Sequence, residues 1–99
     1  MYKLILSEEA TKEFSEAAQW YEEKSGGLGE KYINIIQGKL KLIQQFPERY
    51  PKRKKYFREA VIKTFPYSIV YVFYKKEQII LILSIFHSSR NPRNKFKKK

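Results

Sequence analysis

The one histidine of the chain, His87, is the side chain best suited to proton transfer. It is expected at the end of the last predicted strand, where an imidazole ring is exposed and can act as an acid or a base near neutral pH. With Tyr67 and Arg90 it would form a catalytic set for cutting RNA through the RNA's own 2′-hydroxyl, which needs no metal and no cofactor. The alternative is that His87 is an ordinary structural or surface residue, and the sequence leaves both interpretations open.

A basic segment that includes aromatic residues is the second candidate site. Its cations are Arg49, Lys52, Arg53, Lys54, Lys55 and Arg58, and Tyr50, Tyr56 and Phe57 stand among them. Lysine and arginine bind phosphate and aromatic rings stack on bases, so this pattern is typical of contact with single-stranded nucleic acid. Lys63 and Arg93 complete the predicted target-binding or phosphate-binding set. The alternative is a solvated loop in which Phe57 points into the core.

The composition excludes several classes of enzyme. The chain has no cysteine and no aspartate, and all ten of its acidic residues are glutamate. Disulfides, thiol nucleophiles, cysteine-bound zinc, a histidine metal cluster and a Ser-His-Asp triad are therefore excluded. A two-metal carboxylate site is not expected either, because the basic second half holds only Glu59 and Glu77. We predict no metal, no cofactor and no small-molecule substrate.

The positive charge is concentrated in the second half of the chain. Residues 1–48 hold six Lys and eight Glu, a net charge of −2, whereas residues 49–99 hold fifteen Lys and Arg and two Glu, a net charge of +13. A one-sided positive field of this kind suits a polyanion or an acidic protein partner. The alternative is a solvated surface that only promotes solubility.

The length and the hydrophobic pattern predict one small domain. The 99 residues leave no room for a second core, so we expect a domain over residues 1–90 and a polar, basic, flexible tail over residues 91–99. The longest apolar run, residues 79–83, is far shorter than the roughly 20 residues of a membrane helix. The apolar stretch at the N-terminus is also too short for a signal peptide. We expect a cytoplasmic protein that does not contact a membrane.

Two amphipathic helices are predicted in the first half. Residues 2–6 form a short first strand, and Ser7 is a good N-cap for a helix whose apolar stripe covers residues 10–21. A second helix follows over residues 28–46, and the short linker makes the two an antiparallel hairpin. The glycines within residues 26–29 fit the turn between the helices rather than a phosphate-binding loop, because no strand precedes them and the lysine and hydroxyl of such a loop are missing.

Three strands are predicted in the second half, after a loop over residues 47–56. They cover residues 57–64, 67–75 and 78–86, and the last two are apolar on both faces, which predicts that they are central and form an antiparallel hairpin. The predicted fold is α+β with the order β-α-α-β-β-β, in which the helical hairpin packs on one face of a small antiparallel sheet.

Five short segments carry a family resemblance. They are AAQWYE at 17–22, GLGEKY at 27–32, FPER at 46–49, FPYSIVY at 65–71 and HSSRNP at 87–92. In this order, and over nearly the whole chain, they resemble the RelE/ParE superfamily of toxins from bacterial type II toxin–antitoxin modules. The resemblance implies the fold predicted above and a small basic toxin that an acidic antitoxin neutralises.

The superfamily has two main branches, one cutting mRNA in the ribosomal A site and one poisoning DNA gyrase. RelE-like ribonucleases carry lysines on the strand before Tyr67 and an arginine directly after it, where this chain has Glu59, Val61 and Ser68. His87 is similar to a histidine of another ribonuclease subgroup, which also relies on the arginine replaced by Ser68. The combination of FPY with HxxRNP looks most like ParE-type, or plasmid stabilisation, sequences, although Asn91 stands where many of those carry aspartate.

Three functions follow as hypotheses. The leading one is a growth-inhibiting, ParE-like toxin that acts on DNA gyrase and is neutralised by an antitoxin. The second is a metal-independent, ribosome-dependent mRNA endonuclease. It would use His87 as acid or base together with Tyr67, and Arg90 with Lys52–Lys55 would hold the phosphate. The third is a non-toxic module that binds nucleic acid or an acidic protein through its basic surface.

Overall fold

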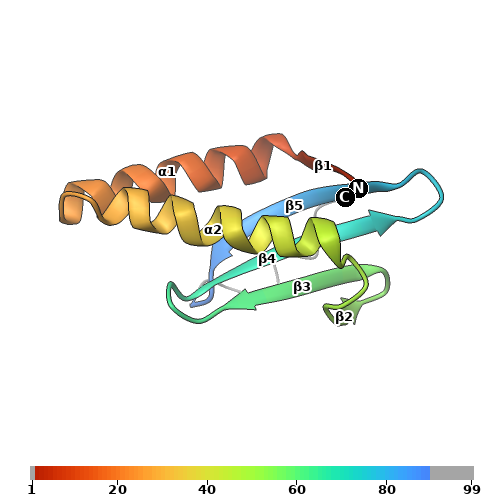
Figure 1. Cartoon of the computed structure of the whole chain (residues 1–99). Coiled ribbons are helices and arrows are strands. Elements are labelled where there is room, and N and C mark those ends of the chain that lie inside the picture. Colours follow the sequence, from red (N-terminus) through yellow and green to blue (C-terminus); the bar gives the residue numbers. More distant parts are fainter. Residues whose placement is uncertain (1, 90–99) are drawn as a thin grey trace.

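The computed structural model of the chain describes residues 2–89 (Figure 1). Along the chain its elements are β1 (Lys3–Leu6), α1 (Glu8–Lys24), α2 (Leu28–Gln45), β2 (Lys52–Lys54), β3 (Phe57–Ile62), β4 (Tyr67–Tyr74) and β5 (Ile79–His87). The two helices lie next to each other and cover one face of the sheet (Figure 1). The predicted α+β fold with a helical hairpin is therefore confirmed.

The strands form one sheet in the order β1-β5-β4-β3-β2. As predicted, β4 and β5 lie inside the sheet and are antiparallel neighbours, and β3 pairs antiparallel with β4. Their two apolar faces explain this position, because an inner strand of a sheet is covered on both sides more often than an edge strand.

Two details of the sheet differ from the expectation. The sheet is mixed rather than wholly antiparallel, because β1 runs parallel to β5. The chain between these two strands includes both helices, which gives the long connection that parallel pairing requires. Residues 52–54, expected in a loop, form the short strand β2 against the start of β3. All three side chains of β2 are exposed, so its hydropathy gives no sign of a strand.

Helix α1 begins where the sequence predicts. The Ser7 hydroxyl accepts the backbone N–H of Ala10 at 3.0 Å and so caps the helix. The same hydroxyl donates to the backbone carbonyl of Leu83 on β5 at 3.0 Å. The cap therefore also ties the start of α1 to the sheet.

The turn between the helices brings them very close together. The Glu22 carboxylate accepts the backbone N–H groups of Gly27 and Gly29 at 2.9 and 3.0 Å, and so satisfies the first amides of α2. A Cβ atom at Gly29 would lie 2.5 Å from the carbonyl oxygen of Ala18, so only glycine fits there. Gly26 and Gly27 form the turn between the two helices, as predicted, whereas Gly29 lies in the first turn of α2.

The main core lies between the helices and the sheet. Its fully buried members include Ala10 of α1, Tyr32, Ile36 and Ile43 of α2, and Ile69, Tyr71, Ile80 and Ile82 of the sheet. Alternate residues of a strand point to opposite faces, so the other face of the sheet holds a second, smaller cluster. This cluster consists of Phe57, Val70, Val72, Leu83 and Phe86. Phe57 is only 4% exposed, which fits the alternative interpretation of that residue.

No helix within residues 2–89 is long and apolar enough to cross a membrane. The tail predicted over residues 91–99, and the boundary after residue 90, lie outside the described residues.

Candidate functional site

The basic segment lies at one end of the sheet, next to the end of α2 (Figure 1). Lys52 pairs with Arg58 and Lys54 with Phe57, so β2 and the start of β3 form a small hairpin. Lys55 occupies the tight turn between them with a φ of 53°. The backbone pairing holds the lysines of this segment in defined positions at an edge of the sheet.

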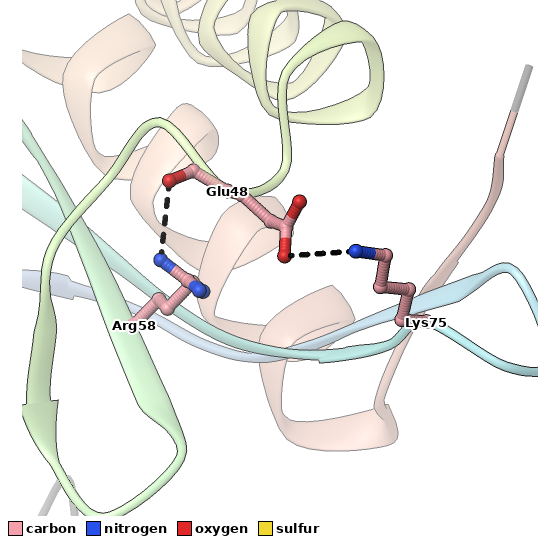
Figure 2. A network of polar contacts seen from close by, with 3 residues as sticks. All are labelled: Glu48, Arg58 and Lys75. Carbon is pink, nitrogen blue, oxygen red and sulfur yellow. Dashed lines mark hydrogen bonds and ion pairs between the residues drawn. The ribbon is translucent and has the colours of Figure 1, made fainter.

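Arg58 makes internal contacts that position this segment (Figure 2). Its guanidinium donates to the backbone carbonyls of Tyr50 at 2.6 Å and Glu48 at 3.3 Å. The Glu48 carboxylate lies 3.7 Å from the ammonium of Lys75 in the turn between β4 and β5. A guanidinium that is held by two carbonyls stabilises the loop at residues 48–50 and offers fewer donors to a phosphate.

The other two arginines of the segment also have partners. The Arg53 guanidinium lies 3.4 Å from the carboxylate of Glu59, and that of Arg49 lies over the Phe46 ring at 4.4 Å. By contrast, within residues 2–89 the ammonium groups of Lys52, Lys54 and Lys55 are exposed and form no ion pair. Of the predicted phosphate-binding set, these three lysines are the ones best placed to meet a target.

Tyr67 and His87 come together at the opposite end of the sheet. They are direct cross-strand partners on β4 and β5, and their rings meet edge-on with 5.3 Å between centroids. The backbone N–H of Ser89 donates to Nδ1 of His87 at 3.1 Å, and the Ser89 hydroxyl lies 2.7 Å from the same atom. Because Nδ1 accepts the backbone N–H of Ser89, this contact fits the neutral tautomer with the hydrogen on Nε2.

The two parts of the predicted site lie at different ends of the sheet. Arg58 is paired with Tyr71, four residues along β4 from Tyr67, a separation of about 13 Å along the strand. Lys63 directly follows β3, whose last residue pairs with Tyr67, so Lys63 belongs to the histidine end. Arg90 and Arg93 lie outside the described residues. The histidine end and the basic segment are therefore two separate surfaces within residues 2–89.

A pocket of about 550 Å³ opens between α1 and the end of β5. It is lined by Glu13, Glu16, Ala17, Trp20, Tyr21, Tyr67, Ile85, Phe86, His87 and Ser89. Sequence reasoning identified only Tyr67 and His87 of this set. Ala17 and Tyr21 belong to the apolar stripe of α1 and were therefore assigned to the core alone. Glu13, Glu16 and Trp20 lie beside that stripe, and the one signal in the sequence was the tryptophan outside the stripe.

A buried tyrosine cluster borders the pocket. The Tyr32 ring packs against Tyr21 and Tyr67, with 5.3 and 5.1 Å between centroids. Burial raises the pKa of Tyr32 well above its usual range, and the nearby Tyr67, Tyr21 and Glu13 act in the same direction. Its hydroxyl is buried without a hydrogen-bond partner among the described residues.

The other face of β3 and β4 carries the positions where the RelE-like resemblance implies cations. Val61 and Ser68 are direct cross-strand partners, and Glu59 pairs with Val70. Ser68 and Glu59 are 3% and 7% exposed, and Glu59 is paired with Arg53. These three side chains carry no positive charge, and they share the face with the apolar cluster around Phe57.

No group of histidine, cysteine or acidic residues within residues 2–89 is arranged to hold a metal ion.

Comparisons with known proteins give a consistent result. The ParDE toxin–antitoxin system from P. aeruginosa contains a chain that superposes with a TM-score of 0.76 at 20% identity, covering 88% of this chain and 96% of that one. A chain of the intact E. coli RelBE complex has a TM-score of 0.71 at 18% identity, covering 91% and 100%. The isolated E. coli RelE toxin has a TM-score of 0.69 at 18% identity, covering 95% and 92%.

At these identities the structural likeness shows a common fold. Comparison with curated proteins yields no significant sequence match. The sequence of residues 4–92, however, matches the family described as the ParE toxin of the type II toxin–antitoxin system parDE. Because this match extends over most of the chain, the protein belongs to the ParE toxin family, within the RelE/ParE superfamily of type II toxins.

Proposed function

We propose that this toxin inhibits growth by acting on DNA gyrase in the cytoplasm. The proposal rests on the side chains of the sheet face that carries Glu59, Val61 and Ser68. Cutting RNA requires cations around the phosphorane, and positions 59, 61 and 68 supply a carboxylate, an isopropyl group and a hydroxyl instead. The membership of the ParE family supports the same target.

The contact with gyrase is assigned to the basic segment. The exposed ammonium groups of Lys52, Lys54 and Lys55 lie on one edge of the sheet, held there by β2 and by the contacts of Arg58. Grouped positive charges speed association with an acidic surface and make it dependent on salt. The same lysines are a suitable docking surface for an acidic antitoxin, whose binding would cover them and prevent contact with the target.

A ribosome-dependent mRNA endonuclease is the second candidate, and the juxtaposition of His87 with Tyr67 favours it. In that mechanism His87, as its imidazolium, would give a proton to the leaving 5′-oxygen and return to the neutral imidazole. The nearest described cation on that end would be Lys63, because the basic segment lies at the other end of the sheet. Arg90, which directly follows Ser89, is the further cation that this mechanism would require.

Primer extension on an mRNA in a cell-free translation reaction separates the two functions. Under our proposal the mRNA stays intact, and induced expression of the toxin still arrests growth. Cuts within codons that vanish without ribosomes would replace the proposal with the endonuclease. In that case His87→Ala should lower cleavage by roughly two orders of magnitude. Salt-sensitive binding to nucleic acid without any effect on growth would instead indicate the non-toxic module.

A further inference from the structure

The pocket between α1 and β5 is acidic and aromatic, in contrast to the strongly basic chain that contains it. Glu13, Glu16, Ala17 and Trp20 follow one another at helical spacing, so one stripe of α1 forms a wall. No lysine or arginine is among the described residues that line the pocket, although the whole chain carries a net charge of +11. The local charge therefore favours a cation.

The aromatic walls are suited to a flat cation. Trp20 is 54% exposed, and its ring meets that of Tyr21 edge-on with 5.1 Å between centroids. The indole already attracts one cation of this chain, because the ammonium of Lys24 lies 4.8 Å from the ring centroid. The pocket therefore has an exposed indole ring that already makes a cation–π contact with a lysine of this chain.

The carboxylates of Glu13 and Glu16 differ in their hydrogen-bond partners. Glu13 accepts the backbone N–H of Ile85 at 2.8 Å and the hydroxyl of Ser84 at 2.9 Å, so it holds α1 to β5. Glu16 is exposed and forms no ion pair within residues 2–89, and it stands one helical turn before Trp20. Glu16 is therefore the carboxylate available to a ligand.

We propose that this pocket binds the guanidinium group of an arginine side chain from a protein partner. A guanidinium is planar, stacks on an indole and donates two parallel hydrogen bonds to one carboxylate, which matches Trp20 and Glu16 better than a round ammonium would. The pocket volume, about 550 Å³, admits the whole side chain. The inference concerns the α1 surface and does not depend on the identity of the toxin's target.

Trp20 provides a direct assay, because it is the only tryptophan of the chain. The purified full-length protein is titrated with argininamide, and in parallel with citrullinamide, which has nearly the same shape without the charge. We expect a saturable change in the emission of Trp20 with argininamide, and an affinity for citrullinamide that is weaker by roughly tenfold. No change, or equal affinity for both compounds, would overturn the proposal.

Two glutamate variants locate the site. Glu16→Gln should weaken argininamide binding by roughly tenfold, whereas Glu23→Gln removes the same charge from α1 outside the pocket and should leave the affinity unchanged. Equal losses in both variants would mean a general charge effect and would refute the site.

The variant Arg90→Gln tests whether an arginine of the same chain occupies the pocket. Argininamide binding that appears only in this variant would assign the pocket to Arg90 and would contradict a partner's arginine.

Discussion

The carboxylate of Glu13 accepts the backbone N–H of Ile85 at 2.8 Å and thereby joins α1 to the last strand. β1 pairs with β5 only as far as Ile82. Beyond that point, the side chains of Ser7 and Glu13 form hydrogen bonds with β5. The Ser7 hydroxyl donates to the carbonyl of Leu83, and Glu13 binds Ser84 and Ile85. Polar side chains thus replace a strand along this part of β5 and hold one wall of the pocket.

Removal of this contact should destabilise the protein. Glu13→Ala leaves the Ile85 amide and the Ser84 hydroxyl without their carboxylate partner, and we expect a loss of about 1–3 kcal/mol in the free energy of unfolding. Urea denaturation followed by circular dichroism measures it. Glu23 on the same helix is exposed and, within residues 2–89, its carboxylate accepts one hydrogen bond, from Gln19, so Glu23→Ala should change stability by less than about 0.5 kcal/mol. Equal effects of the two substitutions would refute the role assigned to Glu13.

Two glycines of α2 should respond to alanine in opposite directions. At Gly29 a Cβ would lie 2.5 Å from the Ala18 carbonyl oxygen and 2.9 Å from the Glu22 Cβ, so the helices must move apart, at a cost of about 1–3 kcal/mol. At Gly38 a Cβ meets no atom within 4 Å, and Gly38→Ala should stabilise the helix by about 0.5–1 kcal/mol. Thermal unfolding of both variants measures the two changes in stability. A Gly29→Ala variant as stable as the wild type would contradict the close approach of the two helices at Gly29.

Two buried tyrosines allow a matched comparison. The Tyr71 hydroxyl donates to the carbonyl of Pro47 at 2.7 Å, so Tyr71→Phe leaves this carbonyl unpaired and should cost about 1–3 kcal/mol. The Tyr32 hydroxyl has no partner among the described residues, so Tyr32→Phe should be neutral or stabilising by about 1 kcal/mol. Chemical denaturation of the two variants checks the difference. A larger loss for Tyr32→Phe than for Tyr71→Phe would contradict this assignment.

The same tyrosines predict a loss of stability in alkali. Burial raises the pKa of Tyr32 and of Tyr71, and the positive charge of Arg58 only partly offsets this for Tyr71. The unfolded chain loses these phenolic protons near pH 10, whereas the folded chain keeps them, so unfolding releases protons above that pH. The stabilising contribution is complete below about pH 10 and falls as the pH rises further.

Urea denaturation between about pH 8 and 11 measures this slope. Because lysines lose their charge over the same range, the wild type is compared with Tyr71→Phe at each pH. The variant should lose less stability in alkali than the wild type, and parallel curves would contradict the raised pKa of Tyr71.

The basic segment can be tested by removal of its lysine charges. Lys52, Lys54 and Lys55 changed together to glutamine should weaken the toxin's action on its target by about tenfold or more, because these exposed charges form one surface. A matched control changes Lys12, Lys31 and Lys41, three exposed lysines of the helices, and so removes the same net charge. Equal effects on growth inhibition would show that only total charge matters.

Much of the fold was predictable because local patterns carry it. The Ser7 cap, the two helical stripes and the inner position of β4 and β5 all follow from residues near one another in the sequence. The parallel pairing of β1 with β5 was not predictable, because it joins residues 76 positions apart, as in Lys3 with Ile79, and a short edge strand does not reveal its neighbour.

The candidate site was predictable only in part. The predicted antiparallel hairpin places the start of β4 beside the end of β5. The direct pairing of Tyr67 with His87, however, depends on the register shift between Val70 and Tyr71, which the sequence does not reveal. The separation of Tyr67 and His87 from the basic segment, and the internal contacts of Arg58, depend on tertiary packing. The role of Glu13 also required the structure, because its partners lie 71 and 72 residues away in the sequence.

A DNA supercoiling assay with purified toxin, gyrase, relaxed plasmid and ATP tests the proposed target most directly. We expect the toxin to inhibit supercoiling and His87→Ala to inhibit it equally well, because the contact is assigned to Lys52, Lys54 and Lys55 at the other end of the sheet. Undisturbed supercoiling at toxin concentrations well above that of gyrase, with growth arrest still occurring in cells, would contradict gyrase as the target.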